Sequence, residues 1–306
     1  MPQTTALQQT NLSQSETGVQ TADDASPRED WDLVITPRDS VLHLHLDDLW
    51  RYRDLIALFV KRDFVTQFKQ TILGPIWFII QPLLTTIMFT IIFGSIAKLS
   101  TDGLPKMLFF LSGNVVWLYF SECLTSTSKT FTENAALFGK VYFPRLAVPI
   151  SITISGLFRF ALQFAFFMAF WTYYKLNGAS IHLTLHCLLF PVLVIIMAGL
   201  SLGIGILLSS MTTKYRDLRF FLEFGIRLLM YGTPVIYPLS AMPEKWKWFI
   251  LANPMTPIIE AFRYSFLGTG SFSWAYLSYS FGFMVVVLFL GVIIFNRIEK
   301  TFMDTV

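Results

Sequence analysis

Long apolar segments without charge constrain this chain more than any other feature. Residues 76–97 are 22 consecutive positions without Asp, Glu, Lys or Arg, and residues 176–213 also lack these four residue types. About 20 apolar residues in a helix cross the hydrocarbon core of a bilayer. Backbone polar groups in lipid must be paired inside the structure, which a helix does within one segment. The sequence therefore predicts membrane-spanning helices rather than a water-soluble domain.

The composition supports an all-α integral membrane protein. Hydrophobic residues make up 54% of the 306 residues and charged residues 14%, compared with about 25% charged in soluble domains. Gln81-Pro82 predicts a kink in the first span, and Gly232 and Pro234 predict an interruption of the fifth. Six transmembrane helices are predicted at about 76–97, 107–127, 147–171, 183–209, 220–237 and 276–295.

The N-terminal part divides into an extension and a helix. Residues 1–46 are predicted to be a disordered cytoplasmic extension, because the stretch is polar and lacks the pattern of a signal peptide. From Asp47 to Lys69, apolar residues recur at steps of three and four, and arginines lie between them. This pattern predicts an amphipathic helix on the inner membrane surface. Packing of the same apolar face against other protein is the alternative. Gly74-Pro75 ends the helix.

Residues 238–270 form a proline-divided region before the last span. Pro238, Pro243, Pro254 and Pro257 separate two aromatic, half-apolar pieces that are too short to cross a bilayer. We expect two re-entrant or interfacial helices there.

The basic residues predict the orientation in the membrane. Counted from Arg51 onward and outside the spans, thirteen lysines and arginines belong to the side that holds the N-terminus, and six belong to the other side. Short cytoplasmic loops carry the excess of basic residues. Both termini are therefore predicted to be cytoplasmic, and the proline-divided region to face outward.

Enzyme chemistry has no clear signature in the sequence. No segment matches G-x-x-x-x-G-K-[ST], so we expect no ATP site in this chain. His182 and His186 are four residues apart, which would place them on one helix face, but no third ligand is near in sequence. The two cysteines, Cys123 and Cys187, lie in apolar segments, as buried small hydrophobic residues do. We predict no catalytic residue, no metal and no cofactor bound by this chain.

The loop between the second and third spans combines basic and aromatic residues. Its lysine and arginine suit water, whereas its aromatic rings offer an apolar surface that a simple connector does not need. We predict that a partner protein contacts this loop. The predicted contact residues are Leu137, Phe138, Lys140, Val141, Tyr142, Phe143 and Arg145.

Aromatic residues are numerous in the predicted spans. Rings at the lipid interface or in helix packing are the simplest explanation. The alternative is a substrate channel in which sugar C–H groups stack on rings. The residues predicted for such a channel are Trp77, Phe78, Phe89, Phe93, Trp117, Tyr119, Phe120, Tyr231 and Tyr237, together with Arg159.

Ionisable residues inside spans are costly, so they pair or face a polar cavity. Glu223 and Arg227 have the i, i+4 spacing of an ion pair on one helix. Arg159 lies near the middle of its span. It could bind an anionic headgroup or diphosphate, or it could neutralise Glu122.

The order of these parts resembles the permease subunits of ABC-2 type polysaccharide exporters, which transport O-antigen, capsule and teichoic acid. The resemblance covers about residues 49–306, and we assign 47–306 to an ABC-2 type transmembrane domain. It rests on the order and spacing of LWRYRDLI at 49–56, KRD at 61–63, KQTILGPIW at 69–77, QP at 81–82, KVYFPR at 140–145 and RIEKTFMD at 297–304.

The resemblance implies a homodimer bound to two copies of a separate P-loop ATPase, which would carry ATP and Mg²⁺. It implies that the loop at about 135–145 is the coupling helix that docks on the ATPase. The substrate would be a glycan linked to undecaprenyl diphosphate, crossing a bacterial inner membrane, with no nucleic acid involved. The re-entrant helices would form an outward gate, to which we assign Trp246, Trp248, Pro254, Glu260 and Arg263.

Three other functions remain open from the sequence. An ABC-2 permease for a drug or lipid would share the fold and the partner. A membrane-embedded glycosyltransferase or acyltransferase would need a cluster of His, Asp or Glu at the membrane edge. A secondary transporter would be expected to show internal repeats or intramembrane acids, and neither is clear here.

Overall fold

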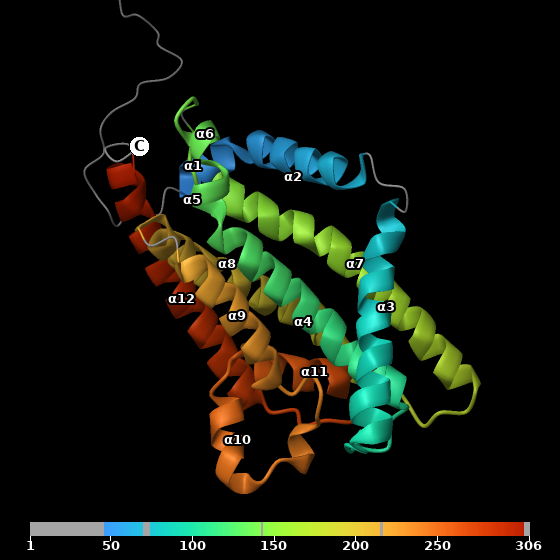
Figure 1. Ribbon diagram of the computed structural model, residues 1–306. Helices are drawn as coiled ribbons and strands as arrows, with labels where there is room; N and C mark the ends of the chain where they lie inside the picture. The colour runs from blue at the N-terminus through green and yellow to red at the C-terminus, as the bar shows by residue number, and fades with distance from the viewer. Residues whose placement is uncertain (1–45, 70–73, 142, 215–216, 303–306) are drawn as a thin grey trace, which may run out of the picture. The chain divides into compact units, whose positions relative to one another are not determined.

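The structure is a computed structural model that describes residues 46–69, 74–141, 143–214 and 217–302. Residues 1–45 of the predicted N-terminal extension and Tyr142 lie outside these residues. Within them the chain is helical, with three 3₁₀ turns and one π-helical segment (Figure 1). The elements are α1 (Leu46–Arg51), α2 (Arg53–Phe68), η1 (Gly74–Ile76), α3 (Trp77–Phe89), η2 (Thr90–Ile96), α4 (Lys106–Ser128), α5 (Thr130–Glu133), α6 (Ala135–Phe138), α7 (Ala147–Leu176), η3 (Leu185–Leu189), α8 (Phe190–Lys214), α9 (Leu218–Tyr231), η4 (Leu239–Ala241), α10 (Glu244–Leu251), α11 (Met255–Leu267) and α12 (Trp274–Phe302).

Five of these helical segments are long and apolar enough to cross a membrane. They are Trp77–Ile96, Lys106–Ser128, Ala147–Leu176, Leu185–Thr212 and Trp274–Ile298. Each coincides with a predicted span. The fifth predicted span, at 220–237, corresponds to α9, which has only 14 residues and ends at Tyr231. At 1.5 Å per residue, α9 is about 21 Å long, so six full-length spans stay a prediction.

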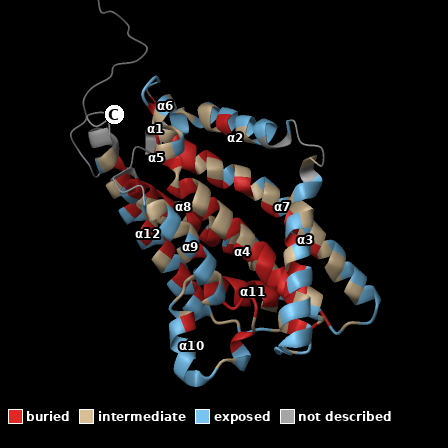
Figure 2. Cartoon of the chain, in the orientation of Figure 1, coloured by how far each residue is buried: buried red, intermediate tan, exposed pale blue. Residues whose placement is uncertain are grey.

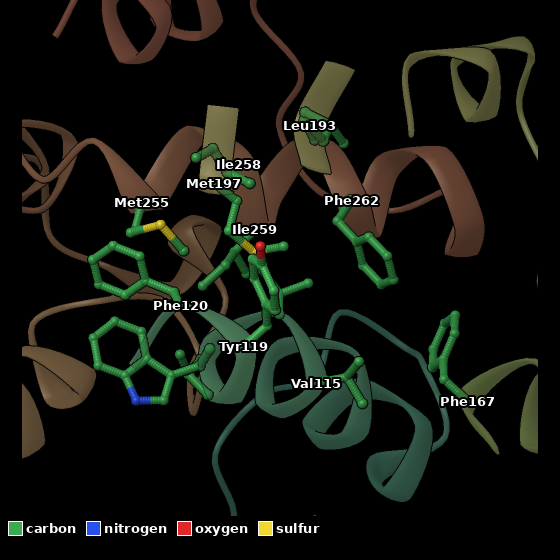
Figure 3. Packing of buried hydrophobic residues seen from close by; sticks show 14 of the residues in the cluster. Val115, Tyr119, Phe120, Phe167, Leu193, Met197, Met255, Ile258, Ile259 and Phe262 are labelled. Atoms are coloured by element: carbon green, nitrogen blue, oxygen red, sulfur yellow. The ribbon is translucent and has the colours of Figure 1, made fainter. Parts of the chain in front are cut away.

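Helix α4 is the axis of the helical unit. It contacts α3, α7, α8, α9 and α11, and Figure 2 shows it buried along most of its length. In Figure 3, Val115 and Tyr119 of α4 lie opposite Ile259 and Phe262 of α11. Nearly every side chain from Leu108 to Phe120 is buried, so α4 is enclosed by protein on all sides, whereas the other long helices keep exposed faces.

Helices α8 and α12 approach each other closely at small residues. A Cβ atom added at Gly203 of α8 would lie 2.9 Å from the backbone nitrogen of Leu288 on α12. A Cβ atom at Gly291 of α12 would lie 2.8 Å from the carbonyl oxygen of Gly203. Small residues at such contacts let helix backbones meet in lipid. The close packing of α8 on α12 therefore requires glycine at these two positions, because a side chain at either would collide with the backbone of the other helix.

A second cluster of buried residues closes the end of the unit that holds α2, α5 and α6. Phe59 of α2, Phe131 of α5 and Phe138 of α6 meet Phe143 and Phe295 there. The rings of Phe131 and Phe295 stack with their centroids 4.5 Å apart. Because Phe295 belongs to α12, the C-terminal end of α12 lies at the same end as α2 (Figure 1).

Two local predictions require correction. His182 lies in the irregular segment before η3 and His186 lies within that short 3₁₀ helix, so they do not share an α-helical face. The helix predicted from Asp47 to Lys69 consists of two pieces, α1 and α2, separated at Tyr52. Its break before the first span is confirmed at Gly74, which has a φ of +50°.

Gly203→Ala is predicted to destabilise the unit by about 1–3 kcal/mol, the usual cost of overpacking, because the methyl group collides with the α12 backbone. The measurement is thermal unfolding of the purified protein in detergent. Gly282→Ala is the matched control, since a Cβ atom there meets nothing within 4 Å. Equal melting temperatures for the two variants would contradict the close approach.

Candidate functional site

The loop predicted to contact a partner has a buried side and an exposed side. Phe138, Phe143 and Arg145 are buried within this subunit. The centre of the Phe143 ring lies 5.6 Å from the centre of the Phe59 ring and 5.8 Å from that of the Phe138 ring. The Arg145 guanidinium lies 5.4 Å from the centre of the Phe138 ring. These three residues therefore support the loop from within.

The exposed side of the loop is small. Val141 is 55% exposed, Lys140 beside it is also exposed, and Leu137 is half-buried. The exposed Val141 side chain offers a partner an apolar surface, and the neighbouring Lys140 adds a positive charge at the edge of that surface. Of the predicted contact residues that the structure describes, Lys140 and Val141 are therefore the ones best placed to touch another protein.

The aromatic residues predicted for a channel do not share one surface. Trp117, Tyr119 and Phe120 are buried in the core around α4, where the Tyr119 hydroxyl donates a hydrogen bond to the Thr153 carbonyl oxygen at 3.3 Å. Phe89 is buried too. Phe78, Phe93 and Tyr237 are half-buried. Only Trp77 and Tyr231 are more than half exposed, at 54% and 55%.

The structure brings Arg159 of α7 to Glu122 of α4. The Nε atom of Arg159 lies 3.5 Å from Oε2 of Glu122. The same guanidinium lies 6.0 Å from the centre of the Phe78 ring on α3. Arg159 thus joins three helices, which is the second of the two roles considered for it. Its Nε atom is buried and makes no hydrogen bond.

Glu223 has a different partner from the predicted one. Its Oε1 atom lies 2.6 Å from Nζ of Lys129. Lys129 follows α4 and Glu223 lies on α9, so the ion pair fastens two helices together instead of bracing one helix through Arg227. Sequence spacing identifies pairs within a helix, but it carries no signal for a partner 94 positions away.

The predicted outward gate contains the most buried charge pair among the described residues. Arg263 of α11 is 1% exposed and Glu260 is 3% exposed. The Nη1 atom of Arg263 donates to the Pro234 carbonyl oxygen at 2.5 Å, and Nη2 donates to that of Val235 at 2.8 Å. Nη1 also lies 3.5 Å from Glu260 Oε1. The guanidinium carbon lies 3.8 Å from the centre of the Phe109 ring.

The other predicted gate residues lie nearby in the chain but in different environments. Trp246 and Trp248 are exposed on α10. Pro254 is half-buried, and its carbonyl oxygen accepts a hydrogen bond from the Ser280 hydroxyl at 2.8 Å. Helices α10 and α11 occupy the two proline-divided pieces as predicted. Whether they re-enter a bilayer stays a prediction.

One link at this end was missed from the sequence. The Ser240 hydroxyl donates to the carboxylate oxygens of Asp102 at 2.7 and 2.9 Å. This contact joins the loop after α3 to η4, 138 positions later. Asp102 has a φ of 51°, and Asp is one of the residues that adopt a positive φ in turns more often than most. No sequence pattern indicates that its partner is Ser240.

Comparison with known proteins agrees with this architecture. A family model described as ABC-2 type transporter matches residues 54–267. An O-antigen export system permease protein RfbA from Klebsiella pneumoniae is 28% identical over 253 residues, which cover 82% of this chain and 94% of the relative. A protein of the same name from Myxococcus xanthus is 26% identical over 218 residues, covering 71% and 81%.

A second group of relatives carries a different name. The polysialic acid transport protein KpsM from Escherichia coli is 24% identical over 252 residues, which cover 81% of this chain and 95% of the relative. These proteins and the present chain match along most of their lengths. Because the family model spans well over half of its residues, this protein belongs to the ABC-2 type transporter family.

Proposed function

We propose that this protein is the membrane-spanning permease subunit of an ATP-driven exporter for a lipid-linked, O-antigen-like polysaccharide. The observation that carries this proposal is the similarity to O-antigen export permeases, which for the Klebsiella pneumoniae relative extends over 94% of its length. The lack of a P-loop motif in the full sequence supports a separate subunit for ATP hydrolysis. The proposed complex has two copies of this chain and two copies of the ATPase in a bacterial inner membrane, with both termini cytoplasmic.

We propose that the ATPase docks on the loop around α6 and that its ATP-driven movement displaces this loop. Lys140 and Val141 lie on its exposed side. On its buried side the Phe143 ring packs on Phe59 of α2 and on Phe138, which in turn contacts Phe131. Phe131 continues this packing to Phe295 of α12. Close-packed interiors transmit displacement because they have few voids. A push on the loop would therefore reach α2 and α12 together.

A polysaccharide path inside one subunit is not favoured, since Trp117, Tyr119 and Phe120 are enclosed in its core. We propose instead that the path lies between two copies. Trp77 on α3 and Tyr231 on α9 present exposed rings that could stack on sugars there. The undecaprenyl diphosphate carrier belongs to the same proposal, and Arg159 would stabilise the helices around the path through Glu122.

The function is tested in cells of the source bacterium. Deletion of the gene for this chain is expected to abolish one surface polysaccharide and to leave its lipid-linked form inside the inner membrane. Immunoblotting of surface glycan and mass spectrometry of extracted lipid-linked glycan measure both effects, and a plasmid copy restores them. Unchanged surface glycan together with altered drug sensitivity or membrane lipid content would favour the alternative permease for a drug or lipid.

The double variant Lys140→Glu/Val141→Asp is expected to weaken binding of the ATPase by about tenfold. The substitutions reverse one charge and place another in the exposed apolar contact, and such changes at an interface cost on the order of 1–3 kcal/mol. Co-purification and ATPase titration measure the effect. Lys245→Glu on α10, at the opposite end, is the control. Full retention of the ATPase by the double variant would refute this docking surface.

Arg263→Ala is expected to lower the free energy of unfolding by about 3–5 kcal/mol, because it leaves Glu260 as a buried charge without its partner. The Pro234 and Val235 carbonyl groups lose their donors as well. Thermal unfolding in detergent measures the change. Arg227→Ala, an exposed arginine on α9, is the matched control and is expected to shift stability by less than about 0.5 kcal/mol. Similar melting curves would show that the network is not structural.

A further inference from the structure

A cavity is lined by residues of α10, α11 and the start of α12. Figure 1 shows α10 and α11 at the end of the helical unit opposite α2 and α6. Its volume is about 770 Å³, which falls in the range of roughly 300–1,000 Å³ usual for small-molecule sites. Its wall combines carboxylates, an ammonium group, hydroxyls and large aromatic rings. The lining residues include Asp102, Ser240, Glu244, Lys247, Trp248, Glu260, Ser271 and Tyr276.

The wall is held by hydrogen bonds between segments distant in sequence. Asp102 accepts from Ser240. Glu260 Oε2 accepts from the backbone nitrogen of Ser271 at 3.0 Å and from its hydroxyl at 3.3 Å, while Oε1 faces Arg263. The first contact fixes the segment before α4 to η4, and the second fixes α11 to the segment before α12. A ligand would meet groups that are already oriented, which lowers the cost of binding.

The aromatic groups of the cavity remain available. Trp248 is 68% exposed, and Tyr276 at the start of α12 is also exposed. The face of an aromatic ring carries partial negative charge, so it attracts the polarised C–H groups on the apolar face of a sugar ring. Carboxylate oxygens are acceptors and an ammonium group is a donor, and both suit sugar hydroxyls. This combination fits a saccharide better than a purely apolar ligand.

The charges of the cavity narrow the choice of saccharide. Three carboxylates, those of Asp102, Glu244 and Glu260, face one ammonium group in the wall, that of Lys247. Lys247 pairs with Glu244 and Arg263 pairs with Glu260. Counting both cations, one negative charge remains in excess. An acidic sugar would therefore be repelled, whereas a neutral sugar would not.

A divalent cation is a weaker explanation of these carboxylates. Two of them already have cationic partners. In the part of the chain that the structure describes, no group of three or more His, Cys, Asp or Glu residues could hold a metal ion.

We propose that this cavity is a binding site for a short stretch of neutral glycan at the outward end of the permease. The glycan stacks on Trp248 and Tyr276, and its hydroxyls bond to Asp102, Glu244 and Lys247. This inference rests on the proposed function, because it makes the cavity a point of contact for the polysaccharide as it leaves. It also assigns the substrate to the neutral glycans rather than to acidic glycans of the polysialic acid kind.

The test is a titration of the purified permease–ATPase complex with fluorescently labelled neutral oligosaccharides, namely oligomers of mannose, galactose and N-acetylglucosamine. Saturable binding of at least one is expected, with an oligomer of sialic acid binding at least about tenfold more weakly. Trp248→Ala is expected to weaken binding about fivefold, as loss of an aromatic contact worth about 1 kcal/mol does. Trp248→Phe, which keeps a ring, is expected to retain most of it.

Trp274→Ala is the matched control, since Trp274 is an exposed tryptophan at the start of α12 that does not line the cavity. Size-exclusion chromatography confirms that each variant is assembled. Absence of saturable binding, equal binding of the sialic acid oligomer, or equal loss in the Trp248 and Trp274 variants would overturn the proposal. The gene-deletion test is independent: surface glycan that depends on this gene without oligosaccharide binding removes the cavity proposal and leaves the export function intact.

Discussion

The buried guanidinium of Arg263 is the constraint on which the end of the protein that holds α10 and α11 depends. A charge with 1% exposure is tolerated only where paired groups surround it. The carbonyl oxygens of Pro234 and Val235, which no helix uses, supply two of these groups. Because α9 ends at Tyr231, the carbonyl groups of Pro234 and Val235 are free to accept hydrogen bonds. Helix α11 lies in the core and brings the Arg263 guanidinium, which donates to both of them.

The opposite end is organised mainly by aromatic rings, with the buried Arg145 guanidinium packed against the Phe138 ring. Phe131, Phe138 and Phe143 fill the space under the α5–α6 loop, and Phe59 and Phe295 close it from α2 and α12. Apolar packing of this kind is non-directional, so it can shift as a body when a partner presses on it. The guanidinium network has fixed directions and resists such shifts. One end is thus suited to receive motion, and the other to hold a fixed geometry around α11.

Sequence reasoning located the elements well and their partners poorly. Charge-free length and prolines identified the five long helical segments, α10 and α11, because these properties act along the chain. The same reasoning left Trp117 open between helix packing and a channel, and it predicted that Phe143 contacts a partner, whereas both residues are buried in this subunit. Aromatic content does not distinguish a ring that faces a path from one that faces the core. Partners such as Lys129 for Glu223 depend on helix packing, which a single sequence does not encode locally.

The polar residues of the described helices illustrate how such packing is stabilised without a hydrophobic driving force between spans. Glu122 and Arg159 join α4 to α7, and Lys129 and Glu223 join the end of α4 to α9. Glu260 and Arg263 pair with each other on α11, and Arg263 also donates to the segment after α9. Every one of these contacts involves α4 or a neighbour packed on it. Because α4 is enclosed on all sides, fixing its neighbours also fixes α11, which lines the cavity through Glu260.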